Sequence, residues 1–146
     1  MSAESTRAEL VAQHERLRAR MEACTRLARL FREGSHPARD LEAALEILRG
    51  EFEFHNQTET TQIRSLLHGP AAWGSLLIDR MLEEHDAEHT AFRALMSGTT
   101  EEVAARIDDL AEELDAHMAA EERTFLAPVT MRDDVLRVRT REESSD

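Results

Sequence analysis

The chain has 146 residues, a length that suits one domain with a single hydrophobic core. It carries 30 acidic against 18 basic residues, and the resulting net charge of −12 argues against nucleic acid and anionic membrane surfaces as partners. No apolar run approaches the ~18 residues of a membrane span, and a lone cysteine, Cys24, fits a reducing compartment. A cytoplasmic protein is therefore expected.

Glycine and proline divide the chain into four long segments. The first three breaks lie at 34–37, 68–70 and 97–99, and Pro128 marks the end of the fourth segment. Glycine just beyond a helix and proline at its start are typical of helix boundaries. Thr99 and Glu102 have the spacing of a capping box, which predicts a helix start at this point. His36 and His68 fall at the breaks and are expected at the surface.

Apolar residues recur every three or four positions within each segment, which predicts helices that each bury one face. No segment alternates as a strand would. Because short connections join long helices, residues 1–130 are predicted to form an all-α, up-down-up-down four-helix bundle. Residues 131–146 are predicted to form a short C-terminal tail that is partly disordered.

Histidine interrupts each of the four apolar faces, and glutamate interrupts two of them. Burying polar groups without partners costs about 1–3 kcal/mol each. These side chains therefore either form a structural polar layer or bind cations, and one histidine alone would favour the former. The whole pattern favours cations, because it contains a single histidine followed by three i,i+4 pairs that each share a helix face. The set is His14, then His55 and Glu59, then His85 and His89, then His117 and Glu121.

Counting residues from the breaks tests whether these side chains lie at one depth. His14 and His55 are equally far from the first break, and His55 and His85 are equally far from the second. Across the third break, however, His117 lies about 7 Å deeper than His85 at ~1.5 Å per residue. A tilted or late-starting fourth helix would remove this mismatch.

The ordered set of motifs resembles the hemerythrin family, specifically hemerythrin-like HHE cation-binding domains. The segment 121–128, Glu-Glu-Arg-Thr-Phe-Leu-Ala-Pro, is similar to the end of the last helix in that family. In oxygen-carrying hemerythrins the last carboxylate follows its histidine by five residues, which would select Glu122, whereas many HHE domains use four, which selects Glu121. Helix geometry favours Glu121, at about 40° from His117, over Glu122, at about 140°.

The resemblance implies two iron ions with a bridging oxo or hydroxo group. His85, His89 and His117 would hold one iron, His14 and His55 the other, and Glu59 and Glu121 would bridge them. Counting ligands leaves one position open on the iron with two histidines, for dioxygen, nitric oxide or peroxide. Candidate walls for this position are Leu17, Met21, Phe52, Met81, Phe92 and Phe125, although ordinary core packing is the better explanation for any one of them alone.

Several functions remain open at this level. The chain would be a binding protein or sensor for a small molecule, a di-iron oxidase or peroxide-decomposing enzyme, a metal store, or a bundle with a structural metal such as zinc. A pocket for an organic substrate near His14 and His55 would favour the enzyme. The redox partner and the oligomeric state are not determined by the sequence.

Overall fold

A computed structural model of the chain describes residues 3–67, 72–123 and 126, without the side chains of 63–67 and 72–82. These residues form five helices and no strand, so the prediction of an all-α fold is confirmed for this part of the chain. The helices are α1 (Ala3–Arg32), α2 (Ala38–Leu67), α3 (Ala72–Leu95), α4 (Thr100–Ala105) and α5 (Ile107–Arg123). The predicted tail, the surface position of His68 and the walls Met81 and Phe125 lie outside the described residues and side chains.

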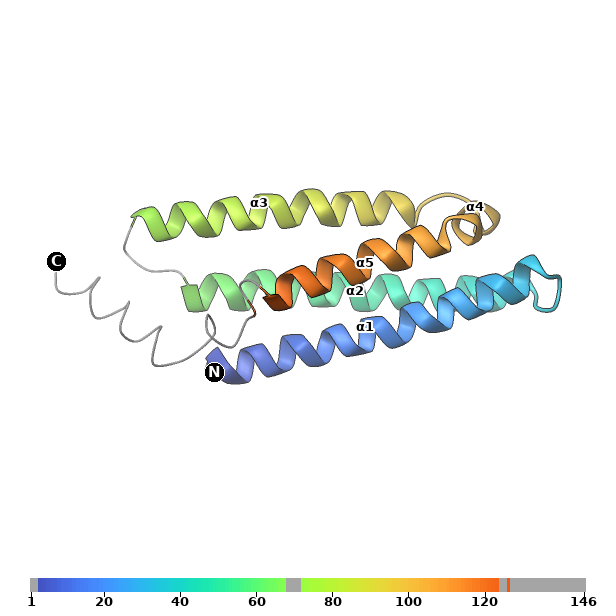
Figure 1. Cartoon of the computed structure of the whole chain (residues 1–146), viewed down its shortest axis with the longest axis horizontal. Helices are drawn as coiled ribbons and strands as arrows, with labels where there is room; N and C mark the ends of the chain where they lie inside the picture. Colours follow the sequence, from blue (N-terminus) through green and yellow to red (C-terminus); the bar gives the residue numbers. More distant parts are fainter. Residues whose placement is uncertain (1–2, 68–71, 124–125, 127–146) are drawn as a thin grey trace.

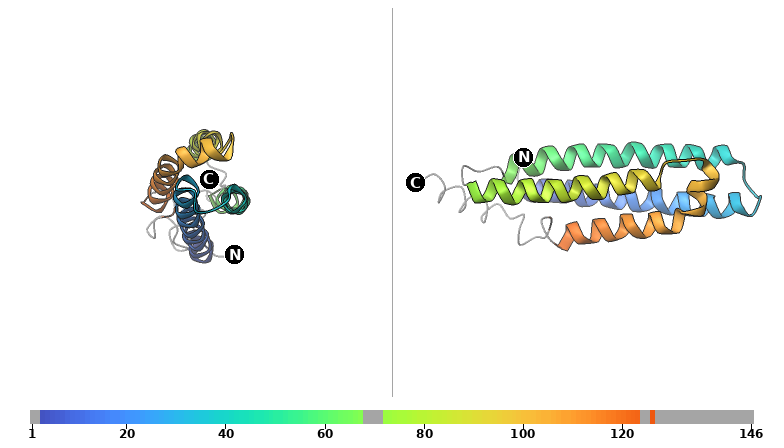
Figure 2. Two further views of the ribbon diagram at one scale, coloured as in Figure 1. Left: turned by 90° about the vertical axis from the view of Figure 1, so that its right-hand side faces the viewer. Right: turned by 90° about the horizontal axis from the view of Figure 1, so that it is seen from above.

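The four long helices lie along one axis, and the chain direction reverses from each of them to the next (Figure 1). Helix α1 packs against α2 and α5, and α3 also packs against α2 and α5, so that each long helix has two such neighbours (Figure 2). The α1–α2 turn contains Gly34 at φ 78°, a left-handed conformation that glycine adopts without strain. Among the described residues, no helix is long and apolar enough to cross a bilayer.

The fourth segment differs from its prediction, because it forms two helices instead of one. Its start is as expected: the amide of Glu102 donates to the side-chain oxygen of Thr99 at 3.2 Å, which caps α4. Helix α4 then ends at Arg106 (φ −102°, ψ 5°), and its axis turns away from that of α5 (Figure 1). The Arg106 guanidinium donates to the carbonyl of Ser97 at 2.6 Å and so ties the bend to the end of α3.

The bend accounts for the 7 Å depth mismatch that residue counting predicts at the third break. Because α4 turns away from the bundle axis, only α5 advances along that axis. His85 lies ten residues before the end of α3 at Leu95, and His117 lies ten residues after the start of α5 at Ile107. The two histidines therefore reach the same depth.

The hydrophobic core fills the end of the bundle that contains the α1–α2 turn and α4. Buried apolar side chains from α1, α2, α4 and α5 meet there, including Met21, Cys24, Ala28, Leu41, Leu45, Leu48, Val103, Ile107, Leu110 and Leu114. The predicted walls Leu17 and Met21 belong to this core. The buried polar residues follow further along the same helices, so the apolar end holds the helices together while the next turns position the site.

Candidate metal centre

Seven of the predicted ligands meet in the interior of the bundle. Helix α1 supplies His14, α2 supplies His55 and Glu59, α3 supplies His85 and His89, and α5 supplies His117 and Glu121. The seven side chains are almost inaccessible to solvent. The most exposed of them, those of His85 and His117, have a relative solvent exposure of 11%. His36, by contrast, is exposed at the α1–α2 turn, as predicted.

The seven side chains form two groups of possible metal ligands. In each group, one nitrogen or oxygen atom per residue lies within 4.8 Å of the corresponding atoms of the others. The first, here called the three-histidine group, contains His85, His89, His117 and Glu121. The second, here called the two-histidine group, contains His14, His55, Glu59 and Glu121. Glu121 belongs to both.

The carboxylate of Glu121 lies between the two groups. Its Oε2 is 2.9 Å from Nε2 of His14, whereas its Oε1 is 3.1 Å from Nδ1 of His85 and 2.5 Å from Nε2 of His117. One oxygen therefore faces each group, which is the arrangement that a carboxylate needs to bridge two cations.

The carboxylate of Glu59 also contacts a histidine of each group. Its Oε2 is 2.9 Å from Nε2 of His55, and its Oε1 is 3.4 Å from Nδ1 of His85. The bundle interior thus contains two carboxylates that each span the gap between the two histidine groups.

Glu122 lies outside both groups, behind His14. Its Oε1 is 3.0 Å from Nδ1 of His14, the ring nitrogen that points away from Glu121. Arg18 donates to both oxygens of Glu122, at 3.1 and 3.0 Å. The geometry therefore favours Glu121 as the metal ligand, whereas Glu122 orients a ligand from behind. Metal binding by either residue stays a prediction.

Two further residues hold histidine rings in the same way, and sequence reasoning missed both. The side-chain oxygen of Gln13 is 2.7 Å from Nδ1 of His55, and Glu88 is hydrogen-bonded to Nδ1 of His117. Such outer hydrogen bonds orient ligating imidazoles and increase their basicity. The sequence gives only a weak indication of these roles. Gln13 and Glu88 each precede a predicted ligand, His14 and His89, but they do not belong to the predicted apolar faces.

The groups share protons when no metal is bound. Burial disfavours the charged forms of His55 and His117, but hydrogen bonds to Glu121 outweigh it and raise the pKa of each to about 9. Burial likewise works against the Glu121 anion, yet hydrogen bonds from His117 and His14 hold its pKa well below its usual value. A cation bound here would replace protons that the site otherwise holds.

His89 differs from its neighbours. Burial, with the nearby charges of His117 and His85, lowers its pKa to about 3, so the ring is neutral near pH 7. Its Nε2 atom is buried and has no hydrogen-bond partner in the part of the chain that the structure describes. A buried nitrogen without a partner costs about 1–3 kcal/mol, and a metal ion would satisfy it. The donor set, five imidazoles and two carboxylates, fits iron, manganese or zinc.

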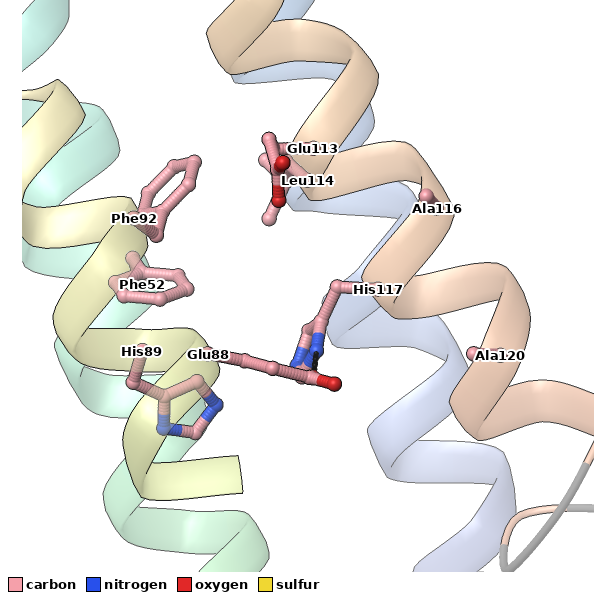
Figure 3. Close-up of a pocket in the computed structure, with 9 residues that line it drawn as sticks. All are labelled: Phe52, Glu88, His89, Phe92, Glu113, Leu114, Ala116, His117 and Ala120. Atoms are coloured by element: carbon pink, nitrogen blue, oxygen red, sulfur yellow. Dashed lines mark hydrogen bonds and ion pairs between the residues drawn. The ribbon is translucent and has the colours of Figure 1, made fainter. Parts of the chain in front are cut away.

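A cavity of about 180 Å³ opens between α3 and α5 (Figure 3). Two predicted walls, Phe52 and Phe92, line this cavity. The cavity borders the three-histidine group, whereas the pocket that would favour an enzyme would lie beside His14 and His55. The lining residues are Phe52, Glu88, His89, Phe92, Glu113, Leu114, Ala116, His117 and Ala120.

Comparison with protein families identifies a match over most of the chain. The family model for the hemerythrin HHE cation binding domain matches residues 5–129. Comparisons with curated proteins and with solved structures gave no significant match.

Proposed function

Because the chain belongs to the hemerythrin HHE cation-binding domain family, as its motifs predict, we propose that it is a non-haem di-iron protein. The observation that carries the proposal is the position of Glu121, which presents one oxygen to each of two histidine groups. For the fold, we infer that α1, α2, α3 and α5 are the four helices of an up-down-up-down bundle and that α4 is the bent start of the fourth.

The proposed ligands follow the two groups. His85, His89 and His117 would hold one iron, and His14 and His55 would hold the other. Glu59 and Glu121 would bridge the pair together with an oxo or hydroxo group. The outer residues then act on the rings: Gln13, Glu122 and Glu88 hold Nδ1 of His55, His14 and His117, which leaves Nε2 of each ring directed inward.

The proposed ligand is a small molecule, namely dioxygen, nitric oxide or peroxide, at an open position beside His14 and His55. When bound and reduced, a di-iron pair would supply two electrons to dioxygen or peroxide. The chain's contribution is to exclude water: His14 and His55 are 0% and 2% exposed, and Leu10 and Leu17 on either side of His14 are buried as well. We propose a cytoplasmic protein, because the lone Cys24 fits a reducing compartment. Its net charge of −12 argues against nucleic-acid and membrane partners.

A second candidate is an oxidase-type or peroxide-decomposing enzyme. The cavity beside His89 and His117 provides space for a molecule larger than a diatomic gas, although it does not adjoin His14 and His55, where a substrate pocket would favour an enzyme most directly. Metal storage and a structural metal site are the remaining alternatives, and both predict that the loaded protein reacts with none of the three small molecules.

Iron content and reactivity test the proposal together. The purified chain, loaded with iron in air, should contain about two irons and absorb in the near ultraviolet as oxo-bridged ferric pairs do. His117→Ala should remove most of the metal, whereas His36→Ala, at the exposed turn, should not. A colourless protein with one zinc, or equal metal loss in both variants, would contradict the proposal.

Rapid mixing of the reduced protein separates the two candidates. A reversible spectral change with dioxygen or nitric oxide indicates a binding protein. Repeated turnover of peroxide, or consumption of dioxygen without recovery of the starting spectrum, indicates an enzyme. No reaction with any of the three would leave only storage or a structural role.

A further inference from the structure

The cavity between α3 and α5 has an apolar floor. Phe52, Phe92 and Leu114 form this floor and are each at most 5% exposed, and the rings of Phe52 and Phe92 lie 4.2 Å apart between centroids. The ring of His89 meets Phe52 edge to face at 5.4 Å, so the floor continues directly to the three-histidine group (Figure 3).

The rim of the same cavity is acidic. Glu88 reaches from α3 across to α5, where it is hydrogen-bonded to His117 (Figure 3). Its side chain remains 58% exposed, and Glu113 on α5 is also exposed. Among the side chains that the structure describes, no arginine lines the cavity, and Arg93, further along α3, is paired with Glu53 at 2.6 Å. Because His117 pairs with Glu88, the carboxylate of Glu113 is the acidic group at the opening for which the described residues show no ion pair. The cavity therefore combines an apolar floor with one exposed carboxylate at its opening.

The volume limits what the cavity can accept. An apolar protein cavity of about 150 Å³ binds benzene. The cavity here, about 180 Å³, thus accommodates one ring or a short branched chain. Glu113 would repel an anion and attract an ammonium group, whose apolar body would cover the aromatic floor.

We propose that this cavity is a binding site for a small organic cation, an ammonium group on a body no larger than one ring. The body packs on Phe52, Phe92 and Leu114, and the ammonium group lies at the carboxylate of Glu113. Only the purpose of this site, which is to hold an organic molecule beside His89 and His117, rests on the proposed function. Binding itself requires no metal.

Three probes of one shape test the proposal on the full chain, both iron-loaded and after chelator treatment. Isothermal titration calorimetry compares benzylammonium, benzyl alcohol and benzoate at pH 7. Benzylammonium should bind about tenfold more tightly than benzyl alcohol, and benzoate most weakly. Equal affinities, or a preference for benzoate, would overturn the assignment of a cation, and no binding of any probe would overturn the site.

Two variants locate the binding. Ala116→Trp adds a bulky ring at the exposed edge of the cavity and should weaken benzylammonium binding about tenfold or more, whereas Ala19→Trp, at an exposed position on α1, should not. Glu113→Gln should reduce the preference for benzylammonium over benzyl alcohol and leave benzyl alcohol unchanged. Equal effects of the two tryptophans, or an unchanged preference in Glu113→Gln, would place the binding elsewhere.

The same experiment distinguishes this inference from the proposed function. If the chain holds no iron but still binds benzylammonium in the cavity, only the di-iron proposal fails. If the iron-loaded chain binds none of the probes, only the present inference fails.

Discussion

The helices bury apolar side chains at one end of the bundle and polar side chains further along. Near the α1–α2 turn and α4, buried leucines such as Leu41, Leu45 and Leu48 form an apolar end. A few turns further along α2, the same face buries His55 and Glu59. The helical period does not change between the two regions, but burial is favourable in the first and costly in the second. The apolar end therefore supplies the stability that offsets the cost of burying the polar side chains.

The largest expected effect is on stability, at the apolar end. Leu48→Ala removes a fully buried side chain and should lower the free energy of unfolding by about 2–5 kcal/mol. Urea denaturation of the metal-free chain measures this change. The variant should still bind metal at the wild-type stoichiometry, and a loss of metal sites in folded Leu48→Ala would show that the two regions are not separable.

Metal binding should produce the next effect, in the polar interior. Metal at about 100 times its dissociation constant should stabilise the chain by about 2.7 kcal/mol, because the unfolded chain lacks the assembled site. His117→Ala should abolish this gain. Calorimetric melting with and without metal provides the measurement, and an equal gain in wild type and variant would contradict the assignment.

A third effect concerns the residue behind His14. Glu122→Gln weakens the hydrogen bond to Nδ1 of His14 and the ion pair with Arg18, and should reduce metal affinity by about 10- to 100-fold. Glu15→Gln is the matched control, since Glu15 is an exposed partner of the same arginine on α1. Competition with a chromophoric chelator compares the two. Complete loss of metal in Glu122→Gln would instead indicate that Glu122 is itself a ligand.

A further effect depends on pH and on the absence of metal. The pKa values of His55 and His117 are raised from 6.5 to about 9, so their protonated forms stabilise the folded chain below pH 6.5. This contribution is lost as the pH rises through 9. The metal-free chain should therefore be less stable at pH 9.5 than at pH 6.5, and unchanged stability in denaturant titrations would contradict the proton sharing.

The last prediction concerns the reaction rate of a thiol at the apolar end. Cys24 is fully buried, and burial raises the pKa of its thiol to about 11. A thiol reagent at pH 8 should therefore react with the folded chain far more slowly than with the denatured chain. Rapid reaction of the folded, metal-loaded chain would mean that the apolar end opens independently of the site.

The sequence predicts which side chains meet in the interior of the bundle, because the helical period itself places them. His55 and Glu59 are one turn apart on a face that otherwise buries leucines, so their burial and proximity follow from spacing alone. The choice between Glu121 and Glu122 also follows from helix angle, and the structure places Glu121 between the groups and Glu122 behind His14.

Other features depend on contacts that spacing does not encode. The bend at Arg106 occurs without glycine or proline in α4 or α5, and a hydrogen bond to Ser97 in the preceding turn holds it. Gln13 and Glu88 contact histidines on other helices, so only the assembled bundle brings them to the site. The cavity beside His89 likewise depends on the separation of α3 and α5.

The position of two metal ions tests the central claim most directly. A crystal structure of the iron-loaded chain, with anomalous data collected at the iron edge, should show two peaks on opposite sides of the Glu121 carboxylate. One peak should contact His85, His89 and His117, and the other His14 and His55. A single peak, or iron bound away from Glu121, would contradict the account.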